Sequence, residues 1–77
     1  MFTSQIATTT ALARVRRLSA SGEAKAIRIR ANVSQSEVAR DIGTTQPALS
    51  LWEAGKRRPS GDSAVRWLEI LDQLERQ

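Results

Sequence analysis

Residues 34–55, SQSEVARDIGTTQPALSLWEAG, decide the fold because they carry the start and stop signals of two short helices. At the first helix, the Ser34 hydroxyl can accept a hydrogen bond from the backbone N–H of Glu37. The Glu37 carboxylate can reach back to the N–H of Ser34, which completes a capping box. Gly43 then provides the left-handed residue that ends this helix. The segment therefore begins with a helix of about two turns, followed by a tight turn.

The second helix of this stretch begins near residues 45–47 and ends at Gly55, with Leu49 and Trp52 as its inward positions. The first helix has one apolar face, formed by Val38, Ala39 and Ile42. Two helices of about two to three turns each can bury these faces only against each other, across a sharp angle. We therefore expect a compact pair of helices whose outer faces remain free.

The spacing of these signals resembles the helix-turn-helix of phage Cro and lambda-repressor-like proteins, also called the XRE family. SQSEVA followed by TTQPALSLWEAGKRRP is similar to the family pattern SQ-x-E-L-A … E-x-G-x-x-x-P. The likeness covers residues 27–74 and places the helix-turn-helix at residues 35–54. It implies an all-α fold, a small bundle of about five helices, that binds double-stranded DNA and regulates transcription. The residues alone also fit a helical hairpin inside an ordinary small bundle.

Composition limits the other classes of protein. The chain has 77 residues and neither Cys nor His, so it lacks thiolate ligands, the commonest general base and the commonest metal ligand. We therefore expect no enzyme, no metal, no cofactor and no small-molecule ligand. Residues 10–77 fit a single domain, and no apolar run is long enough to span a membrane. Without an apolar signal segment in residues 1–20, we expect a cytoplasmic, nucleoid-associated protein of a bacterial cell.

The net charge of +4 is unevenly distributed. Residues 1–33 carry one acidic residue, Glu23, against Arg14, Arg16, Arg17, Lys25, Arg28 and Arg30. Residues 61–77 are acidic, with Asp62, Glu69, Asp72 and Glu75 against Arg66 and Arg76. A basic front and an acidic tail suggest one face for a polyanion and another turned away from it.

The first nineteen residues divide into two parts. Residues 1–9 are polar and Thr-rich, and we expect a flexible segment. Residues 10–19 predict an accessory basic helix, capped by Thr10, with a narrow apolar stripe of Ala11, Leu12, Val15 and Leu18. Two roles fit this helix: it packs on the domain with its arginines in solvent, or its arginines contact phosphate or the minor groove of DNA.

Residues 23–31 predict the next helix, with Ser21 as its N-cap. The resemblance gives Arg28 in this helix a partner. Family members pair an arginine at this position with a glutamate near the end of the second helix of the helix-turn-helix, which is called the recognition helix. That glutamate is Glu53 in this sequence. The resemblance therefore implies a partly buried ion pair between Arg28 and Glu53 that holds the two helices together without touching bases.

A last helix is predicted at residues 61–76, after a basic loop and with Ser60 as its cap. Its apolar positions recur at helical spacing and make an unusually wide stripe. Two interpretations remain open for the residues that widen it: they complete the core of the monomer, or they form the surface of a homodimer. These residues are Trp67, Ile70 and Leu74.

In the resembling family, the N-terminus of the recognition helix lies against base edges in the major groove. Gln46 is the first candidate for a specific contact, because its amide can donate to and accept from adenine. The further candidates are Thr45, which is also the expected cap of the helix, and Pro47, Ala48, Ser50 and Leu51. Pro47 leaves an alternative open, in which the helix starts one residue later with Gln46 as its cap.

Phosphate contacts are expected on both sides of the groove. Gln35, at the start of the first helix of the pair, corresponds to a glutamine that binds phosphate in the family. The loop after the second helix offers Lys56, Arg57 and Arg58 on the other side.

The resulting expectation is a phage Cro-like or small repressor that occupies an operator, as a homodimer at least on DNA. The alternative is an antitoxin that neutralises a toxin protein and autoregulates through the same helix-turn-helix. Only residues 1–18 or the apolar stripe of the last helix could provide a toxin-binding surface.

Overall fold

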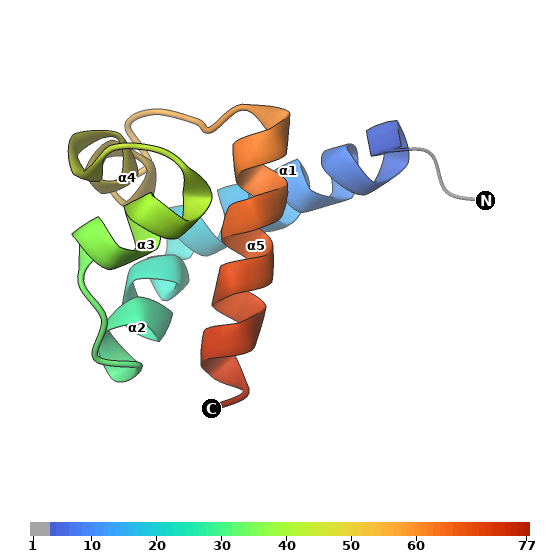
Figure 1. The fold of residues 1–77 in the computed structure, drawn as a ribbon. Coiled ribbons are helices and arrows are strands. Elements are labelled where there is room, and N and C mark those ends of the chain that lie inside the picture. The colour runs from blue at the N-terminus through green and yellow to red at the C-terminus, as the bar shows by residue number, and fades with distance from the viewer. Residues whose placement is uncertain (1–3) are drawn as a thin grey trace.

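The computed structural model describes the backbone of residues 4–77 and the side chains of residues 8–77. This part of the chain forms a bundle of helices without strands (Figure 1). The helices are α1 (Ser4–Ser21), α2 (Glu23–Arg30), α3 (Gln35–Ile42), α4 (Gln46–Glu53) and α5 (Gly61–Glu75). The predicted all-α fold with a helix-turn-helix is confirmed. None of these helices has both the length and the apolar composition that a membrane span requires.

The first helix differs most from the prediction. α1 begins at Ser4, so residues 4–9 continue the helix that was expected to start at Thr10, and Thr10 does not cap it. Residues 1–3 of the expected flexible segment lie outside the described residues. Threonine has low helix propensity, which made a loose segment the expected outcome. The structure shows the compensating tertiary contact, in which Thr8 packs directly against Gly61 at the start of α5.

The apolar stripe of α5 was predicted either to complete the core of the monomer or to form a homodimer surface. In the structure, α1 packs against this stripe. Figure 1 shows α1 crossing behind α5, and Ala11 and Val15 of α1 are 3% and 1% exposed. Trp67 of α5 is fully buried, so the expectation that it marks a homodimer surface is wrong for this residue. Ile70 and Leu74 are half-buried and pack against the same core. The wide stripe therefore completes the core of the monomer.

Two tryptophans connect the helix-turn-helix to the rest of the core. The ring centroids of Trp52 in α4 and Trp67 in α5 lie 5.7 Å apart, with their planes tilted by 42°. Such a pair is worth about 0.5–1.5 kcal/mol beyond the apolar area that it buries. Trp52 is 6% exposed, as its register predicted, and it is not available to stack on bases.

The turn between α3 and α4 has the predicted left-handed residue and one additional contact. Gly43 has φ 88° and its N–H donates to the carbonyls of Ala39 and Arg40. Arg66 of α5 reaches across and donates from Nη1 to the carbonyl of Ile42 at 3.2 Å. A guanidinium at a helix C-terminus satisfies a free carbonyl and complements the helix dipole. α5 therefore holds the end of α3 as well as its packed face.

Smaller differences concern helix ends. α2 ends at Arg30, and its N-cap is Gly22 with φ 81°, whereas Ser21 was predicted. The Ser21 hydroxyl still accepts from the N–H of Glu23 at 3.3 Å, although Ser21 itself closes α1. The left-handed conformation of Gly22 lets α2 follow α1 without a loop. α5 ends at Glu75, with Arg76 as its C-cap.

The contact between Thr8 and Gly61 can be tested directly. A Cβ at Gly61 would lie 2.5 Å from Cγ2 of Thr8, which is closer than two carbons can approach. We expect Gly61→Ala to lower the free energy of unfolding by about 1–3 kcal/mol, measured in urea. In a Thr8→Ala background the same substitution should cost little, because the obstructing methyl group is gone. An equal effect in both backgrounds would show that α1 does not pack on α5 as described.

Candidate nucleic-acid interface

The N-terminus of α4 presents its side chains to solvent. Thr45 is the N-cap, and its hydroxyl accepts from the N–H of Ala48 at 3.2 Å. Gln46 is therefore the first residue of the helix, and the alternative in which Gln46 caps a later start is wrong. Pro47 occupies the second position, where a missing N–H removes no intrahelical hydrogen bond. Gln46 and Pro47 are exposed, while Leu49 and Trp52 lie in the core.

The other predicted base-reading residues lie less openly. Thr45 is exposed at the cap, whereas the remaining three are half-buried on the flank of α4: Ala48, Ser50 and Leu51. Ala48 also packs against the core. The outermost surface of α4 is thus the end that carries Gln46.

A buried ion pair anchors α4 to α2. Nε of Arg28 donates to Oε2 of Glu53 at 2.7 Å, and Nη2 donates to Oε1 at 3.1 Å. The third guanidinium nitrogen, Nη1, donates to the carbonyl of Val33 at 3.0 Å. The side chains of Arg28 and Glu53 are only 11% and 3% exposed. The ion pair that the resemblance implied is therefore present, in the bidentate geometry that arginine and carboxylate favour.

The same carboxylate continues into a chain of glutamines. Nε2 of Gln35 donates to Oε1 of Glu53 at 2.9 Å, and Nε2 of Gln46 donates to Oε1 of Gln35 at 2.7 Å. A carboxylate only accepts, so Gln35 must present its NH₂ group to Glu53 and its carbonyl to Gln46. Gln46 then keeps one N–H donor and its carbonyl acceptor free to face outward. This is the donor and acceptor pair that adenine requires in the major groove.

Among residues 8–77, no buried side-chain nitrogen or oxygen lacks a hydrogen-bond partner, so the buried part of the network is satisfied. Sequence reasoning treated Gln35 and Gln46 separately and missed their contact. Their positions in the sequence were the available signal for this contact. Gln35 is the first residue of α3 and Gln46 is the first residue of α4.

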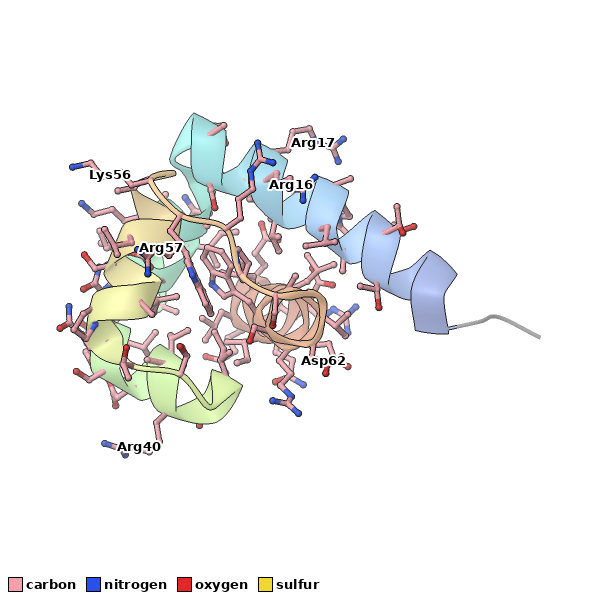
Figure 2. All side chains as sticks on the ribbon, turned by 90° about the horizontal axis from the view of Figure 1, so that it is seen from above. Arg16, Arg17, Arg40, Lys56, Arg57 and Asp62 are labelled. Atoms are coloured by element: carbon pink, nitrogen blue, oxygen red, sulfur yellow. The ribbon has the colours of Figure 1, made fainter. Side chains whose placement is uncertain are left out.

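The phosphate candidates come from two places, the start of α3 and the loop that follows α4. Gln35 is half-buried at the first position of α3, next to backbone N–H groups that no helical carbonyl can satisfy. Lys56, Arg57 and Arg58 are exposed in the loop after α4, and no ion-pair partner is found for them within the described residues. Gly55, with φ 73°, directs the chain from α4 into this loop. Figure 2 shows Lys56 and Arg57 projecting from it.

The exposed start of α4, its buried anchor and the flanking basic loop define the class of protein as a helix-turn-helix DNA-binding domain. A family model described as helix-turn-helix matches residues 25–75, from α2 to the end of α5. The chain belongs to this family, of the Cro and lambda-repressor-like type also called XRE, whose members are DNA-binding transcriptional regulators. Comparison with curated proteins and with solved structures finds no match.

The ion pair makes a prediction about stability. Glu53→Gln leaves the Arg28 guanidinium buried without a counter-charge, so we expect the free energy of unfolding to fall by about 3–5 kcal/mol in urea denaturation. The double substitution Arg28→Met/Glu53→Met removes both charges and should recover much of that loss. A loss below about 1 kcal/mol in the single variant would place the pair in a solvated environment.

The capping box of α3 contains one titratable group, the carboxyl of Glu37. The Ser34 N–H donates to Oε1 of Glu37 at 2.8 Å, and the Glu37 N–H donates to the Ser34 hydroxyl at 3.1 Å. The backbone N–H of Ser34, helped by its hydroxyl and by the charge of Arg40, holds the pKa of Glu37 below its ordinary value of 4.5. The native state therefore favours the ionised carboxylate more than the unfolded chain does, and this contribution is lost as pH falls through the lowered native pKa.

We expect wild type to be more stable than Glu37→Gln by a constant amount above pH 4.5, with the difference shrinking as Glu37 protonates below it. Urea unfolding at a series of pH values measures the difference, since the neutral glutamine does not titrate. A difference that stays constant throughout the acid range would contradict the role assigned to the ionised carboxylate.

Proposed function

We propose that the chain is a sequence-specific regulator that binds double-stranded DNA with α4 in the major groove and occupies an operator as a Cro-like or small repressor. The observation that carries this proposal is the exposed amide of Gln46, held by Gln35 and backed by the buried Arg28–Glu53 pair. Three consecutive contacts thus fix one outward-facing donor and acceptor before any DNA arrives. Preorganisation of this kind lowers the conformational entropy lost on binding.

The remaining contacts follow from the position of this amide. With Gln46 against a base edge, Pro47 and Ala48 offer apolar contact to thymine methyl groups. Gln35 and the N-terminus of α3 lie toward one phosphate strand, and the loop cations Lys56, Arg57 and Arg58 lie toward the other. Direct readout by one glutamine leaves room for a contribution from DNA shape.

We propose that two copies pair on the operator, with half-sites about one helical turn apart. The described residues offer little apolar surface for a stable dimer without DNA, because Ile29 is their one large hydrophobic side chain that is mostly exposed. Pairing through DNA fits this surface better than pairing through α5.

An antitoxin remains the alternative function, and the structure reduces the surface available to it. The apolar stripe of α5, which was one of two candidate toxin-binding surfaces, is largely covered by α1. Much of α1, the other candidate toxin-binding surface, is covered in turn by α5. Retention of DNA by the purified chain alone supports the repressor, whereas co-purification with a stoichiometric partner protein would favour the antitoxin.

Selection of binding sites from a random pool of duplexes tests the proposal, with a palindrome as the expected result. On the selected site, Gln46→Ala should reduce discrimination at one base position by about 1–3 kcal/mol while leaving binding to unrelated DNA unchanged. Arg57→Ala should instead weaken binding to all sequences alike and reduce the dependence on salt. An equal loss of affinity on every sequence for both variants would disprove direct readout by Gln46.

A further inference from the structure

A hollow lies where α1 passes the loop that follows α4. Its volume is about 300 Å³, and it includes Ala54 and Gly55 at the end of α4. The other walls come from the C-terminal half of α1 and from the loop, chiefly Val15, Arg16, Ser19, Arg57, Arg58 and Pro59. The hollow therefore joins residues inside the family match to residues of α1 that precede it.

The charge around this hollow is not balanced. Its lining includes three arginines and no carboxylate. Elsewhere in the described chain, Arg14 pairs with Asp72, Arg28 with Glu53 and Arg30 with Glu23. No ion pair involves the three arginines of the hollow in the part of the chain that the structure describes. Three like charges around one cavity repel one another, and an anion seated there would relieve the repulsion.

The hollow also lies at the C-terminal end of the proposed recognition helix. Ala54 and Gly55 follow directly on α4, so the hollow begins where the recognition helix ends. Figure 2 shows Arg16 and Arg17 in the same half of the view as Lys56 and Arg57, and of the two only Arg16 lines the hollow. In that view Arg40 and Asp62 lie in the other half. A DNA backbone that passes the loop cations would run past the mouth of this hollow.

We propose that Arg16 joins Arg57 and Arg58 in binding one backbone phosphate of the operator, which extends the DNA interface onto α1. The inference rests on the proposed function and adds a contact from outside the residues that the family match covers. Guanidinium groups suit this role because their planar donors bind phosphate oxygens in pairs. The Ser19 hydroxyl at the same hollow provides a further donor. The sequence left two roles open for the basic helix, packing on the domain or contacting DNA. Under this proposal α1 has both roles, because it packs on the domain and presents one arginine to DNA.

The test compares Arg16→Gln with Arg17→Gln, using a mixed-sequence duplex of about three helical turns. Both substitutions remove one charge from the same exposed part of α1, but Arg17 does not line the hollow. Affinity is measured between about 50 and 200 mM salt, where each phosphate contact contributes about 0.9 to the slope of log K against log salt. We expect Arg16→Gln to lower the slope by about 0.9, so that the fourfold salt increase costs about 3.5-fold less affinity than in wild type. Arg17→Gln should leave the slope unchanged.

A shared phosphate makes a second measurement possible. If Arg16 and Arg57 bind the same phosphate, the double variant Arg16→Gln/Arg57→Gln should lose less DNA affinity than the product of the two single-variant losses. Ethylation interference on the selected operator should show one phosphate whose modification weakens DNA binding by wild type but does not further weaken binding by Arg16→Gln. Circular dichroism verifies that the exposed substitutions leave the helices intact.

The outcomes separate the two proposals. Wild type that binds no duplex at all overturns the proposed function, and the inference with it. Wild type that binds DNA, with equal slopes for Arg16→Gln and Arg17→Gln, overturns the inference alone. Losses that multiply fully in the double variant also overturn the shared phosphate.

Discussion

The hydrogen-bonded ion pair of Arg28 and Glu53 is the interaction on which the remaining site depends. Its two short contacts join α2 to the last residue of α4, and the third guanidinium nitrogen holds the carbonyl of Val33 just before α3. One side chain therefore fixes three helices relative to one another. Desolvation of such a pair offsets much of its Coulomb energy, so its main effect is on position. The position it sets is that of Gln35 and, through Gln35, of Gln46.

Local signals explain why most of the helix-turn-helix could be predicted. Ser34 and Glu37 form the capping box, Gly43 takes the left-handed conformation and Thr45 caps α4, because each needs only neighbours within a few residues. The inward register of Trp52 follows equally from helical spacing. The Arg28–Glu53 pair lies 25 residues apart in sequence and was accessible only through the family resemblance.

Two of the features that sequence reasoning missed depend on contacts between α5 and helices distant from it in the chain. Thr8 of α1 packs against Gly61 of α5, and Arg66 of α5 donates to the carbonyl of Ile42 at the end of α3. No periodicity within one segment contains this information. The width of the α5 stripe was recognised correctly, but its partner was not, since α1 has a narrow stripe of its own and offers mainly Ala11 and Val15 as cover. Small residues such as Ala11 allow two helices to approach closely.

The packing of α1 has two consequences that reinforce each other. By covering the apolar stripe of α5, it leaves little of that stripe exposed to a second copy, which is why we propose that two copies pair on the DNA that they share. By passing beside the loop after α4, it places Arg16 at the same hollow as Arg57 and Arg58, where the proposed phosphate contact would add to the electrostatic part of binding. Two copies that pair only on DNA, as proposed, need more affinity for DNA from each copy. The arginines left unpaired around the hollow are where this fold can provide it.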